Sequence, residues 1–348
     1  MRKTTLLLGL LLVAAALTLS ACAGAEGPAG PVGPAGPAGP PGEAASAADL
    51  TCTECHNNTT VILSKEGQFR ETSVHGTGES FIRGEEGSCA GCHGTEGVVA
   101  RIGAGLPPHD ESVVGITNVS PFDCRTCHVI HTSYTAADWA LTGGAAPVKL
   151  EYTAGTFDGG SGNLCANCHQ IRNAPPKVEA GNVAVTSSRF GTHYGVEAQM
   201  LLGEGALGVT GTPSAHYAGV EGTCVACHLG EEANHTYLPD TARCVACHAD
   251  AESFDVNGTQ TEIAAMLEEL HTIFVDKKLL NPETDLWGVY DTAAGKFSNP
   301  SADAPLVVPE AVANAMWNYK FVTYDASMGV HNSAYAKAIL EAALEAMK

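Results

Sequence analysis

The chain has 348 residues, and its 38 acidic and 18 basic side chains give a net charge of −20 at pH 7. A surface this negative repels nucleic acid, so we expect no nucleic-acid partner. Cationic partners such as metal ions or basic patches on other proteins are favoured, although such a charge can also serve solubility alone.

Residues 1–21 have the features of an export signal. Arg2 and Lys3 give a positive start, and residues 6–19 form an apolar run that is short for a membrane span. The following Leu-Ser-Ala-Cys resembles the lipobox of bacterial lipoproteins, which predicts lipidation of Cys22 and attachment to a membrane by lipid. Ala23, in place of Asp, favours the outer membrane, facing either the periplasm or the outside. An ordinary signal peptide and a transmembrane anchor are the alternatives.

Residues 22–49 predict a tether behind the lipidated cysteine. Gly recurs at every third position from Gly27 to Gly42, which is the period of collagen. Six triplets are few for a triple helix, so we predict a polyproline-like spacer that extends by about 3.1 Å per residue. A collagen-like trimer is the alternative.

The pattern Cys-x-x-Cys-His occurs six times, all between residues 50 and 250. It is typical of covalent c-type haem attachment, because the two thiols reach the two vinyl groups of one porphyrin and the following His lies below the iron. A zinc ribbon or a set of disulfides would not require a His after every second Cys. The predicted attachment residues are Cys52, Cys55, Cys89, Cys92, Cys124, Cys127, Cys165, Cys168, Cys224, Cys227, Cys244 and Cys247. The predicted proximal iron ligands are His56, His93, His128, His169, His228 and His248.

The predicted fold is mainly α with much irregular structure: a hexahaem core over residues 50–250, followed by a C-terminal helical layer over residues 251–348 that packs on it. Aromatic residues make up only 6% of the chain, so haem faces must supply much of the core. Within it we expect loops at residues 155–162 and 203–211 and short helices at 135–141 and 196–202. The layer should contain a helix from a capping box at Thr259 and Glu262, a second from Pro309 to about Val322, and a third from Asn332 to Met347.

Eight histidines remain for the sixth coordination position, and methionine, the other common ligand, occurs only six times. His131 lies too close to His128 in sequence to reach the far face of the same haem, so it is better placed to serve a neighbouring one. His193 is expected to open a helix, and His216 and His235 lie on loop-like sequence.

Several strings outside the haem motifs carry a family resemblance. They are residues 94–102, Cys127 to Thr132, Gly191 to Gly195, Asn234 to Thr236 and Asp325 to Tyr335. From about Cys52 to Met347 the sequence resembles a group of exported multihaem cytochromes that is distantly similar to pentahaem nitrite reductase and octahaem hydroxylamine oxidoreductase. The resemblance implies that the distal ligands are His75, His131, His193, His216, His235 and His331. His109 and His271 match no ligand position and are predicted to be spare.

We expect electron transfer through six haems, with other cytochromes or an extracellular acceptor as redox partner and no catalytic residue. The nitrite reductases of the group carry a Cys-x-x-Cys-Lys motif, which this sequence lacks. Two alternatives stay open. One is a reductase of nitrite, hydroxylamine or a similar small substrate, with one haem open to substrate. The other is a filament subunit in which a His of one copy ligates a haem of the next.

Overall fold

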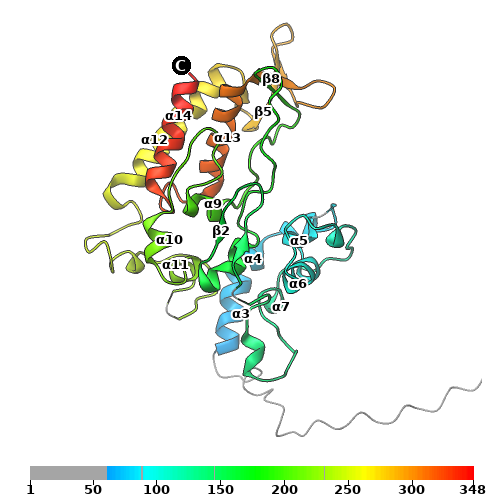
Figure 1. Cartoon of the computed structure of the whole chain (residues 1–348), viewed down its shortest axis with the longest axis vertical. Coiled ribbons are helices and arrows are strands. Elements are labelled where there is room, and N and C mark those ends of the chain that lie inside the picture. The colour runs from blue at the N-terminus through cyan, green and yellow to red at the C-terminus, as the bar shows by residue number, and fades with distance from the viewer. Residues whose placement is uncertain (1–60, 88, 145, 231) are drawn as a thin grey trace, which may run out of the picture. The chain divides into compact units, whose positions relative to one another are not determined.

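Short helices joined by long irregular segments make up most of the chain (Figure 1). A computed structural model describes residues 61–348 except Ser88, Ala145 and Glu231. The signal peptide, Cys22, the tether and the first haem motif, Cys52 to His56, lie outside the described residues. The helices are α3 (Val61–Glu71), α4 (Val74–Thr77), α5 (Ala90–His93), α6 (Thr95–Gly103), α7 (Cys124–Cys127), α8 (Asn163–Ala166), α9 (Glu197–Leu202), α10 (Ala215–Gly219), α11 (Cys224–His228), α12 (Thr259–Asp276), α13 (Glu310–Asp325) and α14 (Ser333–Ala346). The mainly α, irregular fold class is therefore confirmed.

Short 3-10 helices add single turns between these elements. They are Ser80–Arg83, Glu111–Val113, Ala136–Trp139, Gly160–Gly162, Thr241–Arg243 and Val256–Gly258. The two short helices predicted in the motif region are present, one as the 3-10 helix Ala136–Trp139 and the other as α9. Residues 155–162 are not a pure loop, since a short strand and a 3-10 helix lie within them.

The strands form separate antiparallel pairs rather than one sheet. The pairs are β1 (Val148–Lys149) with β2 (Thr156–Phe157), β3 (Asn182–Val185) with β8 (Leu306–Pro309), β4 (Leu280–Asn281) with β5 (Leu286–Trp287), and β6 (Val289–Asp291) with β7 (Lys296–Ser298). In the second pair Val183 lies opposite Val308, and both are buried. The pairing of β3 with β8 joins the motif region to the C-terminal region.

The three predicted C-terminal helices are present as α12, α13 and α14, and they pack on one another (Figure 1). The predicted capping box is wrong: the residue before α12 is Gly258, at φ 72°, and Thr259 is already helical. Glycine fits here because that backbone conformation is costly for residues with a Cβ. α14 has a true side-chain cap, since the Asn332 side chain accepts a hydrogen bond from the amide of Tyr335.

The main hydrophobic core lies between these helices and the end of the motif region. Trp287, Trp317, Phe274 and Phe321 are fully buried in it, together with Met200 from α9. Each such side chain stabilises the fold by roughly 1.5–3 kcal/mol relative to an exposed one. The helical layer therefore shares one core with the residues that follow motif 4.

The segment that carries motifs 2 and 3 has little apolar core of its own. Between residues 61 and 147, as far as the structure describes them, the buried hydrophobic residues are Ala90, Val98, Ile102 and Val113. Protein interiors are normally close-packed with apolar side chains. Large apolar groups other than side chains are therefore needed to fill this segment, as haem would do.

Candidate haem-binding sites

Each described motif closes into one helical turn. The amide of His93 donates to the carbonyl of Cys89 over 2.9 Å, and motifs 3, 4 and 6 repeat this bond over 2.7–2.9 Å; motif 5 is α11 itself. An i to i−4 bond places the first Cys and the His one above the other on the same face. The motif spacing therefore places the first Cys and the His of each described motif on one face of a turn.

Each described motif His faces one predicted distal His across a gap of constant width. We number each pair by its motif and give the distance between ring centroids. The pairs are pair 2 (His93 and His193, 6.2 Å), pair 3 (His128 and His235, 6.3 Å), pair 4 (His169 and His75, 6.0 Å), pair 5 (His228 and His331, 6.4 Å) and pair 6 (His248 and His216, 6.2 Å). No described histidine belongs to two of these pairs.

The width of the gap equals that of a metal held between two imidazoles. A metal to nitrogen bond is about 2 Å long and the nitrogen lies about 1 Å from its ring centre, so two opposed rings have centroids roughly 6 Å apart. The five values, 6.0–6.4 Å, agree with this spacing. Direct ring packing can give one such distance by chance, but it does not explain the one-to-one matching of motif and non-motif residues.

In most of the paired histidines, the ring nitrogen Nδ1 lies within hydrogen-bond distance of another group. In six of the ten paired histidines that the structure describes, Nδ1 lies 2.7–3.2 Å from a backbone carbonyl oxygen. The partners are Ser80 for His93, Trp139 for His128, Tyr194 for His193, Val330 for His216, Tyr237 for His228 and Ala233 for His235. A bond at Nδ1 fixes the tautomer and orients the ring, which leaves Nε2 to bind a metal.

Two paired histidines bond to a carboxylate instead. Nδ1 of His169 lies 3.0 Å from Oε2 of Glu197, and Nδ1 of His331 lies 2.8 Å from Oδ1 of Asp325. Glu197 raises the pKa of His169 to about 9. Burial lowers the pKa of His331, but Asp325, together with Glu197 and Cys224, outweighs it and raises the pKa to about 9. Metal binding at Nε2 would displace the proton there, while the Nδ1 proton stays in the bond to the carboxylate.

Burial acts in the opposite direction on His75, the second member of pair 4. It lowers the pKa of His75 to about 4, so this ring is neutral at pH 7. The neutral ring is the form that ligates a metal.

Three of the histidines that the structure describes stand outside the five pairs. Nδ1 of His109 lies 2.5 Å from Glu151, and Nε2 of His271 lies 3.3 Å from Asp285. Neither faces one of the motif histidines that the structure describes, and their predicted role as spare residues stays a prediction. His131 stacks on Tyr134 with a centroid distance of 5.5 Å, and its predicted role as a distal ligand stays a prediction, because His56 of the first motif lies outside the described residues.

Two expectations about local structure are wrong. His193 does not open a helix: it has φ 69°, and α9 begins four residues later, at Glu197. His216 lies in α10 rather than in a loop, and α4 contains His75. Both helices are a single turn, too short to show a periodic apolar pattern in the sequence.

Residues of different sites contact one another, and these contacts show which sites are neighbours. The side chains of Cys92 and Cys168 contact each other, which places motif 2 beside motif 4. Those of Cys165 and Cys224 do the same for motifs 4 and 5. The Val330 carbonyl that holds His216 of pair 6 precedes His331 of pair 5.

Tyr237 joins three pairs. Its ring lies 5.1 Å from the ring of His75 and 6.1 Å from that of His235, and its carbonyl accepts the bond from His228. Pairs 3, 4 and 5 are therefore neighbours. This residue carries no signal in the sequence, because its contact with His75 comes from a distant segment.

Two buried arginines lie between motifs 2 and 4. Arg101 is fully buried and donates to the carbonyl of Gly91 in motif 2 over 2.8 Å and to that of Asn167 in motif 4 over 3.1 Å. Arg172 donates through Nη2 to the carbonyl of Cys168, but its buried Nη1 has no partner among the described residues. An unsatisfied buried guanidinium is costly, and it fits a group with carboxylates of its own, such as the propionates of haem.

The arrangement does not fit a zinc ribbon or a set of disulfides. Within the residues that the structure describes, no group of three or more His, Cys, Asp or Glu side chains has the geometry of a metal-ion cluster. The ten motif cysteines from Cys89 to Cys247 form no disulfide. No helix in the described part is long and apolar enough to cross a membrane.

Comparisons with known proteins add one distant likeness. No family model and no curated protein matches the chain. Among solved structures, the crystal structure of outer cell wall cytochrome OcwA resembles it at 22% sequence identity, with a TM-score of 0.45. The match covers 75% of this chain and 45% of the other, so this chain corresponds to less than half of that cytochrome.

Proposed function

We propose that the chain is a hexahaem c-type cytochrome that transfers electrons, with each iron held between two imidazoles. The five histidine pairs, each of a motif residue and a distal residue about 6 Å apart, are the observation that supports this best. Bound haem would supply a one-electron iron couple. The cysteines fix each ring, and two strong-field imidazoles keep the coordination unchanged between oxidation states, which favours electron transfer over chemistry at the metal.

A catalytic role would need an iron with an open or exchangeable position. His193, His235, His75, His331 and His216 close the distal side of the sites of motifs 2 to 6. We assign His131 to the first motif, where it would face His56. The same assignment satisfies all six irons within one chain, which a filament subunit would not require.

The contacts between motifs support a branched order of sites. The links between pairs 3 and 4, 4 and 5, and 5 and 6 give a continuous row, and the contact of Cys92 with Cys168 adds pair 2 as a branch at pair 4. His131 lies three residues from His128, so the first site would extend the row beyond pair 3. Pair 4 is then the junction of the protein.

The position of the protein in the cell follows from residues 1–49. We propose that Cys22 is acylated and that the Gly-Pro segment holds the haem-bearing unit away from the outer membrane. The net charge of −20 favours a redox partner with a basic docking patch. A partner cytochrome or an extracellular acceptor would then receive the electrons.

A carbon monoxide titration of the reduced protein distinguishes these functions. Six bis-imidazole irons should give no carbon monoxide adduct at neutral pH and no turnover of nitrite or hydroxylamine. One carbon-monoxide-binding haem per chain together with turnover would support the reductase instead. Native mass of a Cys22→Ser protein in detergent-free solution should be that of a monomer; an open series of oligomers would support the filament.

A further inference from the structure

We infer that Glu197 and Asp325 are positioning residues that make the irons of pairs 4 and 5 the most strongly reducing in the chain. The inference rests on the proposed function, because it concerns the potentials of ligated irons. It extends that function by predicting which haems of the row have the lowest reduction potentials.

Helix α9 contacts His169 at two points. Oε2 of Glu197 lies 3.0 Å from Nδ1 of His169, and the amide of the next residue, Ala198, donates to the His169 carbonyl over 3.1 Å. Glu197 is the first residue of α9, where a negative charge is stabilised by the exposed amides of the helix end. The carboxylate is thus held in place beside the ligand.

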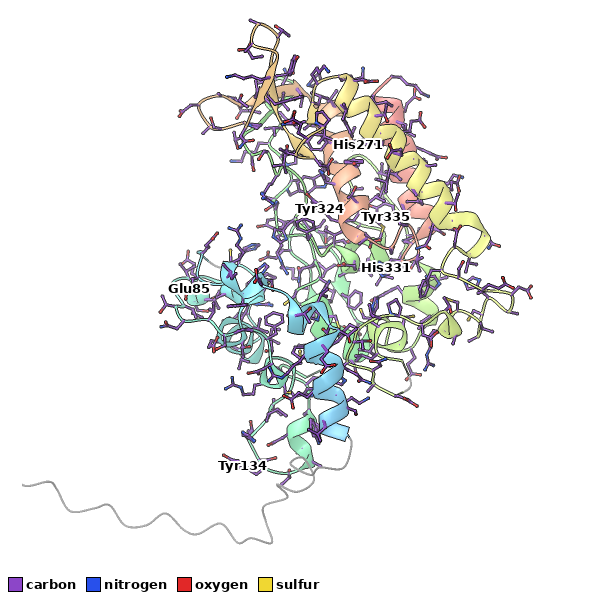
Figure 2. The ribbon with its side chains drawn as sticks, turned by 180° about the vertical axis from the view of Figure 1, so that it is seen from behind. Glu85, Tyr134, His271, Tyr324, His331 and Tyr335 are labelled. Carbon is purple, nitrogen blue, oxygen red and sulfur yellow. The ribbon has the colours of Figure 1, made fainter. Side chains whose placement is uncertain are left out.

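Asp325 acts in the same way on the distal side of pair 5. Its side chain is fully buried at the end of α13 and lies 2.8 Å from Nδ1 of His331. Ser327 donates to its other oxygen, and the same hydroxyl accepts the amide of His331. Figure 2 shows His331 at the end of the C-terminal helices, far along the layer from His271.

In the other six histidines whose Nδ1 bond was described above, the partner is a neutral backbone carbonyl. A charged partner and a neutral partner affect the iron differently. A carboxylate draws the Nδ1 proton more strongly than a carbonyl does, so the imidazole becomes a better electron donor and favours Fe(III). Burial strengthens the effect, because the charge of Asp325 is poorly screened. Each iron takes up one electron, from Fe(III) to Fe(II), and the proton remains on the imidazole.

Buried cations lie between the site of motif 4 and that of motif 2. Arg172 and Arg101 stand between motifs 2 and 4, and the ligands of pair 2 bond only to the carbonyls of Ser80 and Tyr194. A buried cation favours the reduced iron. These cations lie beside both pairs, but neither ligand of pair 2 bonds to a carboxylate, so electrons that reach the junction at pair 4 should collect on the haem of pair 2.

The test is a spectroelectrochemical titration of the holoprotein with Glu197→Gln and Asp325→Asn. Each amide keeps an oxygen that accepts the Nδ1 bond but removes the charge. In each variant the equilibrium constant for reducing one of the most strongly reducing haems should rise at least tenfold. Its reduction potential should therefore rise by about 59 mV or more. Glu151→Gln is the matched control, because Glu151 contacts His109, which belongs to no pair. It should leave all six steps in place.

The outcomes separate the inference from the function on which it rests. Unchanged potentials in both variants, or an equal shift in the Glu151→Gln control, would overturn the inference. Six low-spin haems and no carbon monoxide adduct in the same samples would still support the proposed function. A high-spin haem in the unaltered protein would refute that function whatever the potentials are.

Discussion

Replacing His331 with Ala removes an imidazole of pair 5 and the partner of a buried carboxylate at once. The Asp325 side chain is fully buried, and in the variant it keeps only the hydroxyl of Ser327. Loss of one partner of a buried ion pair costs about 3–5 kcal/mol. We take about 3 kcal/mol because one donor remains, and a loss of that size should lower the melting temperature by roughly 6 °C.

The same variant should alter one haem in six. With its distal ligand gone, one iron per chain should become high-spin and bind one equivalent of carbon monoxide when reduced, while five stay low-spin. The assay is a carbon monoxide titration followed in the Soret band, together with a thermal melt at a fixed heating rate.

Two further variants separate the effect on stability from the effect on the haem. Asp325→Ala added to His331→Ala should recover most of the lost stability but not the low-spin haem, because only the unpaired charge has been removed. His271→Ala is the matched control: its partner Asp285 is half exposed, so stability should change by less than about 1 kcal/mol and the spectrum not at all. If His331→Ala retained six low-spin haems that bind no carbon monoxide, the pairing of His228 with His331 would be refuted.

Other consequences can be tested separately. Cys22→Ser should release the protein from membranes with six haems bound; continued sedimentation with membranes would place the anchor elsewhere. His131→Ala should create one carbon-monoxide-binding haem, and an unchanged spectrum would exclude it as the partner of His56. The ring planes of pair 4 are almost perpendicular, at 87°, whereas those of pair 3 lie at 29°, so electron paramagnetic resonance of the oxidised protein should show both axial and rhombic low-spin signals; rhombic signals alone would contradict the geometry of pair 4. Arg172→Leu removes a cation between motifs 2 and 4 and should lower the potential of at least one iron by about 59 mV; a redox titration that shows no downward shift would mean that Arg172 acts on neither haem.

The haem motifs could be found from the sequence because their chemistry is local. A single helical turn brings Cys89, Cys92 and His93 into position, and five residues encode it. The helices α12 to α14 were predictable for a similar reason, since each is long enough to show an apolar face. Gly258 was missed because a Thr and a Glu three residues apart imitate a capping box.

The pairing of ligands could not be derived from spacing. His75 and His169 come from distant segments, and His193 and His216 lie in a turn and in a one-turn helix that have no sequence signature. The role of Glu197 could not be predicted either, because its carboxylate reaches His169 only through the position of α9 in the fold. The β4–β5 and β6–β7 hairpins were missed because strands of two or three residues are too short to show alternation.

The central claim is that every iron lies between two imidazoles of one chain. An experimental structure of the holoprotein, with irons located by anomalous scattering, tests it most directly. We expect six irons per chain, five of them midway between the rings of pairs 2 to 6 and the sixth between His56 and His131. An iron with an open distal side, or with a ligand from another copy, would contradict the account.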